Sequence, residues 1–321
     1  MTSETLLPSQ DAPIYVAGHH GLVGSAVWRA LAAAGFTNLV GFRSSEVDLT
    51  DRDAAADALA TVRPAVVVDA AARVGGILAN STQPVDFLED NLRIQTNLFA
   101  AAHNADVPRL LFLGSSCIYP KFADQPIRES SLLTGPLEPT NQAYAIAKIA
   151  GIIGVQAYRE QYGRAWISAM PTNLYGPGDN FDLRTSHVLP AMIRKFHEAK
   201  LSGDPVTLWG TGTPRREFLH TDDVASAVVH LLGHYDDPET INIGTGTDVT
   251  IAELAATIAD VVGYEGEVRW DTGKPDGTPR KLLDVSRLLA LGWRPQVSLR
   301  DGIASTYRWY LEQGDGRTGE T

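Results

Sequence analysis

The stretch that decides the fold covers residues 13–24 and reads PIYVAGHHGLVG. An apolar run ending in Gly18 predicts a buried strand over 13–18, and the alanine-rich pattern that follows predicts a helix over 22–34. Between them, glycines recur at every third position, at Gly18, Gly21 and Gly24. Such a turn presents backbone N–H groups and a helix N-terminus to a pyrophosphate. The loop therefore predicts a dinucleotide site, and a purely structural turn is the alternative.

The alternation of strands and helices continues through the first half of the chain. Apolar and amphipathic runs predict strands at 37–42, 64–72, 109–116 and 165–171, and helices at 51–62, 85–104 and 141–162. This order predicts a parallel sheet with right-handed crossovers. We expect a Rossmann-type doubly wound α/β domain over 11–174, joined by 217–244, and a smaller C-terminal α/β substrate lobe over 175–216 and 245–312. Residues 1–10 and 313–321 are expected to be loose tails.

The composition narrows the class of protein. A net charge of −11 argues against a nucleic-acid partner, which requires a basic face. The single cysteine cannot form an internal disulfide, and the start of the chain lacks the basic and apolar regions of a signal peptide. No apolar stretch reaches the roughly 18 residues that span a bilayer. We therefore expect a cytoplasmic protein with no membrane partner and no metal site.

The end of the second predicted strand bears on the type of dinucleotide. An acid here usually binds the ribose hydroxyls of NAD. In this chain Arg43, Ser44 and Ser45 come before the first acid, Glu46. Arginine and hydroxyl groups favour a 2′-phosphate, so the prediction is NADP(H), with His20 as a further contact. The nearby Glu46 keeps NAD as the alternative.

Tyr144 and Lys148 form the next chemical pattern. Their spacing of four places both side chains on one face of the predicted helix 141–162. An ammonium beside a phenol is expected to lower the pKa of the tyrosine, which can then exchange a proton with a carbonyl oxygen. Ser115, at the end of the preceding strand, can donate a second hydrogen bond to that oxygen. The alternative is a Tyr–Lys pair on a solvent-exposed helix face.

The glycine loop, Ser115 and the Tyr144–Lys148 pair together resemble the extended short-chain dehydrogenase/reductase family, whose members mostly act on nucleotide sugars. The resemblance implies a Rossmann domain, a C-terminal substrate lobe and a homodimer joined through helices 85–104 and 141–162. It also implies a cofactor site made of Gly18, His19, His20, Gly21, Leu22, Val23, Gly24, Arg43, Ser44, Ser45, Leu113, Gly114, Ser115, Ser116, Tyr144, Lys148, Pro171, Thr172, Asn173, Leu174 and His187.

Further blocks resemble one group within that family. These blocks are GSSCIYP, EPTNQAYAIAKIAG, MPTNLYGPGDNF, SHVLPAMIRKFHEA, WGTGTPRREFLH and KPDGTPRKLLDV, within 13–312. The group epimerises GDP-4-keto-6-deoxy-D-mannose at C3 and C5 and reduces C4 with NADPH, giving GDP-L-fucose. The resemblance implies that Lys195, Trp209, Arg216 and Asp276 contact the GDP portion. Asn173 and Asn180 are further candidate polar contacts, and Lys281 is one without an assigned role.

Cys117 and His187 supply what the implied epimerisations need. A C4 ketone acidifies the hydrogens at C3 and C5, and inversion requires a base on one face of the sugar and an acid on the other. Neighbouring positive charge can shift a thiol toward thiolate, so Cys117 is the predicted base. Imidazole titrates near neutral pH, so His187 is the predicted acid. The alternatives are a small buried cysteine and a histidine no more significant than His220.

Rival functions remain at this point. UDP-sugar 4-epimerases and GDP-mannose 4,6-dehydratases share the Tyr144–Lys148 pattern but recycle the hydride and have no need of a Cys–His pair. A non-catalytic NADP sensor would have no reason to combine Ser115, Tyr144 and Lys148. Cys117 and His187 are therefore the residues that discriminate among these functions.

Overall fold

A parallel sheet forms the centre of the computed structural model, which describes residues 5–274 and 276–313. Its six strands lie in the order β10-β5-β4-β3-β1-β2, and every neighbouring pair is parallel. The predicted α/β class with a parallel sheet is confirmed. The strands are β1 (Ile14–Ala17), β2 (Leu39–Val40), β3 (Val66–Asp69), β4 (Arg109–Leu113), β5 (Ala165–Pro171) and β10 (Ile241–Ile243).

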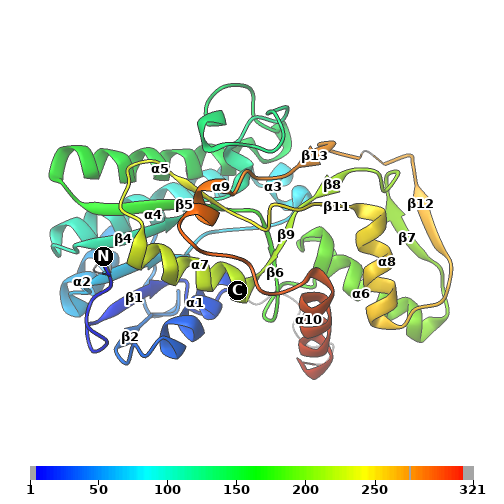
Figure 1. The fold of residues 1–321 in the computed structure, drawn as a ribbon, viewed down its shortest axis with the longest axis horizontal. Helices are drawn as coiled ribbons and strands as arrows, with labels where there is room; N and C mark the ends of the chain where they lie inside the picture. The colour runs from blue at the N-terminus through cyan, green and yellow to red at the C-terminus, as the bar shows by residue number, and fades with distance from the viewer. Residues whose placement is uncertain (1–4, 275, 314–321) are drawn as a thin grey trace.

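Helices cover both faces of this sheet (Figure 1). On one face α1 (Leu22–Ala33) packs beside α7 (Thr221–His234), and on the other α4 (Pro84–Asn104) packs against both α2 (Arg52–Val62) and α5 (Gln142–Tyr162). Successive side chains of β3 alternate between these two cores: Val66 and Val68 lie in the first, and Val67 lies in the second. Burial on both faces explains the continuous run of valines in β3.

Element ends are decided by local polar groups. Asp51 caps α2, where its Oδ1 accepts hydrogen bonds from the N–H groups of Asp53 at 2.8 Å and Ala54 at 3.1 Å. The strand predicted over 64–72 ends earlier, at Asp69, whose Oδ1 accepts from the Ala71 N–H at 3.2 Å. A short helix that the pattern did not predict, α3 (Ile77–Thr82), precedes α4.

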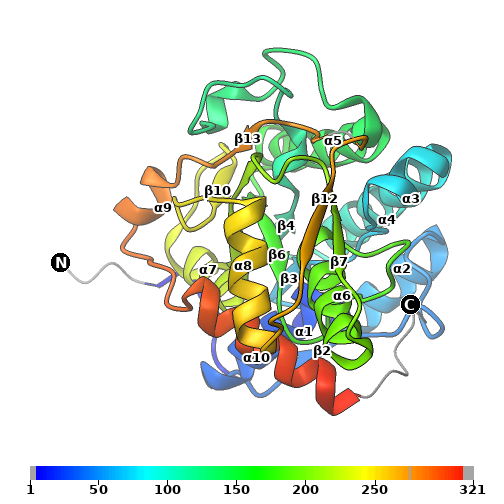
Figure 2. The same cartoon turned by 90° about the vertical axis from the view of Figure 1, so that its right-hand side faces the viewer.

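The C-terminal half builds a second group of elements at the end of the molecule that lies on the right in Figure 1 and faces the viewer in Figure 2. A third buried cluster holds it together. Its small sheets pair β7 with β12, β6 with β9, and β8 with both β11 and β13. The elements are β6 (Asn173–Tyr175), α6 (Val188–Ser202), β7 (Val206–Trp209), β8 (Arg215–Arg216), β9 (Phe218–His220), β11 (Val249–Thr250), α8 (Ile251–Val262), β12 (Val268–Asp271), β13 (Arg280–Lys281) and α10 (Leu299–Gln313). Helix α9 (Ser286–Ala290) instead packs against β10, and its Leu288 lies in a core of the main sheet.

The N-terminal segment contacts the sheet domain. The Leu6 N–H donates to the Gly233 carbonyl at 3.0 Å, and the Thr37 N–H donates to the Gln10 carbonyl at 2.9 Å. Residues 5–10, expected to be part of a loose tail, are thus tied to α7 and to the chain before β2. Gln313, also expected to belong to a loose tail, ends α10. The remaining expected tail residues, 1–4 and 314–321, lie outside the described residues.

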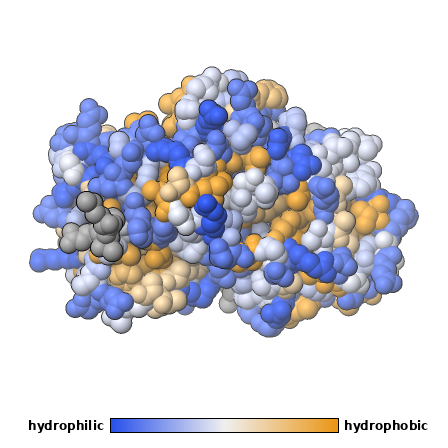
Figure 3. Space-filling view, viewed as in Figure 1, coloured by the Kyte–Doolittle hydropathy of each residue, from blue (hydrophilic) through white to orange (hydrophobic). Residues whose placement is uncertain are grey.

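The viewed surface is mixed in polarity. Figure 3 shows hydrophilic side chains around much of this face and apolar ones gathered nearer its middle. Within residues 5–274 and 276–313, no helix is both long and apolar enough to cross a membrane.

The strand order reverses between β1 and β3, because the chain goes from β1 to β2 on one side and from β3 to β4 and β5 on the other. Loops at such a switch point diverge at the carboxyl ends of the strands and leave room for a ligand. Gly18 follows β1 and Ala70 follows β3, so the glycine loop lies at this point.

Candidate active site

The glycine loop is shaped by close backbone contacts. Gly18 has a φ of +74°, and a Cβ there would lie 2.8 Å from the Ala70 carbonyl oxygen. A Cβ at Gly24 would lie only 2.1 Å from the Gly18 oxygen. Helix α1 starts at Leu22, and no side chain caps its first turn. The loop therefore leaves the N–H groups of α1 available to an anion, which fits a dinucleotide pyrophosphate.

The predicted 2′-phosphate contacts lie on the surface after β2. Arg43, Ser44 and Ser45 are exposed, as is His20. The Glu46 carboxylate accepts a hydrogen bond from the Arg43 N–H at 2.7 Å, so this acid is engaged with the local backbone. In the part of the chain that the structure describes, the Arg43 guanidinium forms no salt bridge. This arrangement suits a phosphate better than a pair of ribose hydroxyls.

His19 is used differently from His20. Its ring packs beside Trp28, with 5.4 Å between ring centroids, and a Cβ added at Gly41 would lie 2.4 Å from it. Burial lowers the pKa of His19, and its Nδ1 is buried without a hydrogen-bond partner. His19 therefore packs the end of β2 against the glycine loop, and its Nδ1 remains able to form a hydrogen bond.

Ser115 and Cys117 lie immediately after β4. Ser115 begins a 3₁₀ turn, η1 (Ser116–Ile118), and its Oγ accepts from the Cys117 N–H at 3.4 Å. The Cys117 side chain is buried, with 7% of the residue exposed. Burial raises the pKa of the thiol, while the charge of Lys281, the hydrogen bond to Ser115 and the charge of Lys148 act in the opposite direction. The predicted net shift toward thiolate is therefore wrong, although positive charge does face the sulfur.

Tyr144 and Lys148 point from the first turns of α5 toward the end of β4. Lys148 Nζ donates to the Leu113 carbonyl oxygen at 3.0 Å and lies 5.9 Å from the centroid of the Tyr144 ring. Burial raises the pKa of Tyr144, the charge of Cys117 raises it further, and a hydrogen bond with Ser115 lowers it. The predicted lowering of this pKa is wrong, because desolvation outweighs the one opposing interaction, the hydrogen bond with Ser115. Tyr144 thus keeps its proton at neutral pH.

His187 is brought to the same region by α6, for which it is the N-cap residue. Part of His187 is exposed, but the surrounding protein atoms desolvate the imidazole and lower its pKa. The charge of Lys281 lowers this pKa further. The loop before His187 is tied to the start of α3, since the N–H of Gly76, the N-cap residue of α3, donates to the Thr185 carbonyl at 2.8 Å. His187 and Cys117 are therefore both coupled to one lysine, Lys281.

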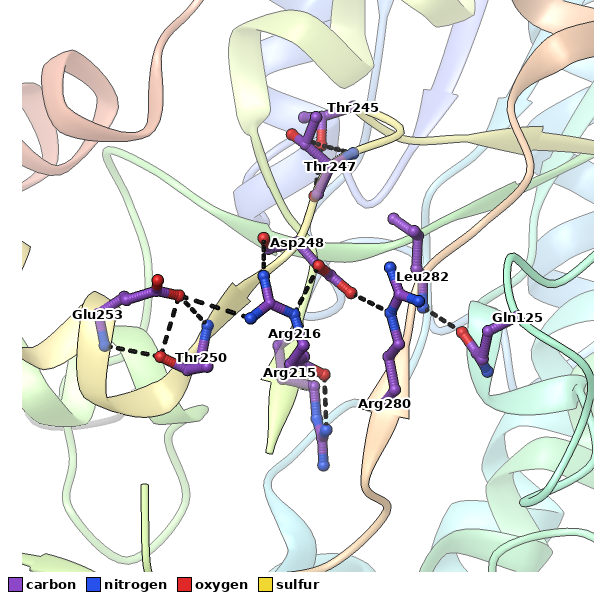
Figure 4. A network of polar contacts seen from close by, with 10 residues as sticks. All are labelled: Gln125, Arg215, Arg216, Thr245, Thr247, Asp248, Thr250, Glu253, Arg280 and Leu282. Atoms are coloured by element: carbon purple, nitrogen blue, oxygen red, sulfur yellow. Dashed lines mark hydrogen bonds and ion pairs between the residues drawn. The ribbon is translucent and has the colours of Figure 1, made fainter. Parts of the chain in front are cut away.

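Lys281 lies on β13, an edge strand of the small sheet β11-β8-β13. Figure 4 shows the polar contacts of its neighbour Arg280 and of Arg215 with Asp248. Strand β13 pairs with β8 so that Lys281 lies opposite Arg216. Asp248 joins the two strands: its Oδ1 accepts from Arg215 Nε at 2.9 Å and its Oδ2 from Arg280 Nε at 2.5 Å. This ion-pair network engages Arg215 and Arg280, whereas the charges of Arg216 and Lys281 repel each other near the site.

The residues implied for GDP line a region near β7. Lys195 Nζ donates to the Thr207 carbonyl at 3.1 Å. Trp209 at the end of β7 is 64% exposed, and Lys274 Nζ lies 5.5 Å from its ring centroid. Asp276 accepts from the Thr211 N–H at 2.7 Å and from its hydroxyl at 2.9 Å. Asp276 therefore shapes the turn after Trp209 and leaves the indole open to a flat ligand.

The remaining predicted residues follow β4, β5 and β6. Ser116 is buried in η1, and the Gly114 N–H donates to the Ala169 carbonyl at 2.9 Å. Asn173 Nδ2 donates to the Glu217 carbonyl at 2.7 Å, and Asn180 Nδ2 donates to the Thr185 hydroxyl at 2.8 Å. Asn180 thus braces the loop that leads to His187. Pro171 ends β5, Thr172 is buried beside it, and Leu174 lies in β6.

The comparisons with known proteins agree with this geometry. The family model described as "NAD dependent epimerase/dehydratase family" matches residues 14–244. The chain belongs to this family. "GDP-L-fucose synthase 1" from Arabidopsis thaliana is 58% identical over 307 residues, which cover 95% of this chain and 95% of the relative. "GDP-L-fucose synthase" from Escherichia coli (strain K12) is 55% identical over 312 residues, which cover 94% of this chain and 97% of the relative.

A solved structure of the family extends the likeness to the whole fold. The crystal structure of a GDP-L-fucose synthetase from Naegleria fowleri bound to NADP superposes with a TM-score of 0.91 at 28% identity, covering 99% of each chain. The predicted resemblance to the extended short-chain dehydrogenase/reductase family and the predicted Rossmann-type fold are confirmed.

Two buried carboxyl groups at the site escaped the sequence analysis. Asp69 ends β3 inside the sheet, and its presence at the end of an otherwise apolar run was a usable signal. Glu217 is fully buried, and its two oxygens accept from the N–H groups of Thr245 and Gly246 at 2.7 Å each and of Leu283 at 3.0 Å. Glu217 thereby ties the chain after β13 to the main sheet, and nothing in the sequence marked it.

Proposed function

We propose that the protein converts GDP-4-keto-6-deoxy-D-mannose into GDP-L-fucose by epimerisation at C3 and C5 followed by reduction of C4 with NADPH. The observation that carries the proposal is the position of Cys117, the single cysteine of the chain. It is buried two residues after Ser115 and couples electrostatically to Lys148 and Lys281. A simple carbonyl reductase has no use for a thiol there, and the similarity to GDP-L-fucose synthases supports the same reaction.

The site fits NADP(H), which when bound supplies a hydride to C4. The uncapped start of α1 accommodates the pyrophosphate, and exposed Arg43, Ser44 and Ser45 suit a 2′-phosphate. The related Naegleria structure with NADP supports this cofactor. Lys148 offers its remaining N–H donors to the nicotinamide ribose.

The epimerisations use groups on two sides of the sugar ring. Cys117 removes a proton next to the carbonyl, and His187 returns one to the opposite face of the same carbon. Ser115 and Tyr144, which share a hydrogen bond, stabilise the negative charge on O4 as it develops. The charge of Lys281 acts to lower the pKa of both Cys117 and His187. It therefore favours the thiolate form of the base and makes the imidazolium of His187 a stronger acid.

The reduction requires a proton donor for O4. Tyr144 fills this role because burial raises its pKa and keeps the phenol protonated at neutral pH. Ser115 holds the oxygen within reach of the phenol by its own hydrogen bond. Proton transfer from Tyr144 to O4 then completes the alcohol.

The C-terminal elements bind the GDP part of the substrate, at a distance from the reacting sugar. Arg216 and Lys195 carry the positive charge that a diphosphate requires, and burial lowers the pKa of both side chains, which an anion would reverse. Trp209 offers an exposed ring for the guanine to stack on. Asp276 contacts the guanosine part of the nucleotide, as the family resemblance implies.

Two broader features belong to the same proposal. Aliphatic side chains of α5, among them Ile146 and Ile153, are exposed, which supports a homodimer formed through α4 and α5. Light scattering should show a dimer that Ile153→Glu converts to a monomer, and a monomeric wild-type protein would contradict it. The proposal includes a cytoplasmic location, predicted from the single cysteine together with the absence of signal-peptide and membrane-spanning patterns.

Product analysis tests the proposed reaction against its rivals. The protein is incubated with GDP-4-keto-6-deoxy-D-mannose and NADPH, and the sugar and the oxidised cofactor are measured. We expect GDP-L-fucose with one NADPH consumed for each sugar converted. GDP-6-deoxysugar that retains the D-manno configuration at C3 and C5 would identify a plain 4-reductase. Sugar conversion without net NADPH consumption would identify an enzyme that recycles the hydride, and either result overturns the proposal.

A further inference from the structure

Asp69 is a fully buried acid at the carboxyl end of β3, with 0% of the residue exposed. Side chains two residues apart on a strand share a face, so Asp69 faces the same way as Val67, toward the core beneath α4 and α5. Its register partner on β4 is Phe112, which lies in that core. Asp69 is thus an acid placed among apolar residues, where an isolated charge is costly.

One of the two carboxyl oxygens of Asp69 lacks a partner. Oδ1 accepts from the Ala71 N–H at 3.2 Å, whereas Oδ2 is buried without any hydrogen bond. Asp69 interacts electrostatically with the charge of Lys148, from α5, and with the phenol of Tyr15 on the neighbouring strand β1. A buried carboxylate with an open oxygen therefore lies near a buried ammonium.

Lys148 needs a counter-ion. It is 3% exposed, and its Nζ donates to one neutral acceptor, the Leu113 carbonyl, while the group has three N–H donors. Nζ also lies 4.8 Å from the Phe112 ring centroid. Since Phe112 is the register partner of Asp69, the aromatic ring is a neighbour common to the lysine and the acid.

We propose that Asp69 is a positioning residue that keeps Lys148 in its ammonium form and so sets the upper pH limit of cofactor binding and carbonyl reduction. The proposal rests on the function proposed above, because it assumes that Lys148 serves the nicotinamide ribose beside Tyr144. No bond is made or broken by Asp69 itself. The negative charge of Asp69, at the end of β3, stabilises the protonated form of Lys148 on α5.

The directions of the two pKa shifts agree with this coupling. Burial raises the pKa of Asp69 to about 6, and the charge of Lys148 opposes that rise. Burial lowers the pKa of Lys148, and the charges of Asp69 and then Cys117 oppose that fall. Above pH 6 the acid is anionic and supports the ammonium. Without Asp69 the lysine is expected to lose its proton at a pH about 1–2 units lower.

The test compares the wild-type protein with Asp69→Asn, which keeps the shape of the side chain and removes its charge. NADPH affinity is measured between pH 6 and pH 10, and kcat for C4 reduction over the same range. We expect the alkaline midpoint of both profiles to move down by about 1–2 pH units in Asp69→Asn. Unchanged midpoints would overturn the proposal.

Asp223→Asn is the matched control. Asp223 is also a buried acid, but it lies on α7 and accepts from the Gln296 N–H at 2.9 Å and the Val297 N–H at 3.0 Å. This variant is expected to lose stability and to keep both alkaline midpoints. An equal shift in Asp223→Asn would mean that general destabilisation moves the profiles, which overturns a specific role for Asp69.

A second measurement needs no Asp69 variant and no sugar. In protein labelled with [4-¹³C]aspartate, the carboxyl signal of Asp69 is followed by NMR during a pH titration, with and without Lys148→Met. Removing the lysine charge should raise the midpoint of Asp69 by about one pH unit or more, and an unchanged midpoint overturns the proposal. Failure of the proposed reaction would appear in the product analysis instead, since neither NADPH binding nor the NMR titration depends on the sugar.

Discussion

Replacing Gly24 by alanine tests whether the start of α1 must lie against the glycine loop. An added Cβ would lie 2.1 Å from the Gly18 carbonyl oxygen, 2.6 Å from its carbonyl carbon and 3.0 Å from Cα of His19. Non-bonded heavy atoms are comfortable at about 3.5 Å, so helix and loop must separate by about 1 Å or more. Every clashing atom belongs to the backbone, so no side-chain rotation relieves the contact.

Two magnitudes follow for Gly24→Ala. Overpacking of this kind costs up to about 3 kcal/mol, which lowers Tm by roughly 6 °C in a chain of this size. Displacing the start of α1 removes at least one charge-assisted hydrogen bond to the pyrophosphate, worth about 1.5–3 kcal/mol. NADPH affinity should therefore fall at least about tenfold.

Thermal unfolding and fluorescence titration with NADPH measure the two effects. Gly21→Ala is the control for stability, because Gly21 has a φ of −71° and a Cβ there would meet only the Gly18 oxygen, at 3.3 Å. Its Tm should stay within about 2 °C of the wild-type value. A Gly24→Ala protein with wild-type Tm and wild-type NADPH affinity would refute the account of the loop.

Three further substitutions test two catalytic residues and one buried acid, Asp179. Cys117→Ser should slow deuterium incorporation at C3 and C5 by about 100-fold or more while the fold stays intact, and normal exchange in this variant would rule out Cys117 as the base. In the wild-type protein the exchange rate should rise from pH 6 to pH 9, because burial raises the pKa of the thiol. Tyr144→Phe should lower kcat for NADPH oxidation by about 100-fold or more while calorimetry shows GDP binding unchanged, and an unchanged kcat would exclude Tyr144 from the mechanism. Burial raises the pKa of Asp179 to about 7, so the native state holds more protons than the unfolded state between about pH 4 and pH 7 and stability falls as pH rises through that window. Asp179→Asn should therefore lose less Tm than the wild-type protein between pH 5 and pH 8, and equal losses would contradict a buried, titrating Asp179.

The sequence marks one of the two buried acids, Asp69, and does not mark the other, Glu217. Asp69 ends a run of valines, and an acid at that position has to find a partner once the sheet is covered on both faces. The partner, Lys148, is contributed by α5, a helix that follows the next strand of the chain, β4. Glu217, by contrast, follows two arginines and looks like part of a charged surface, yet it is fully buried and accepts hydrogen bonds from backbone N–H groups of two other segments.

The sequence by itself determined the parallel sheet, the glycine loop after its first strand and the placement of Tyr144 and Lys148 on one helix. These features depend on local spacing: glycines at a strand end, valines buried on both faces, and two side chains one helical turn apart. Only the tertiary structure decided the direction of the pKa shifts of Tyr144 and Cys117. Only the tertiary structure coupled Asp69 to Lys148, and it also coupled Lys281 to both Cys117 and His187. The physical reason is that desolvation and Coulomb interactions depend on which distant segments cover a group, and a linear pattern carries no record of that covering.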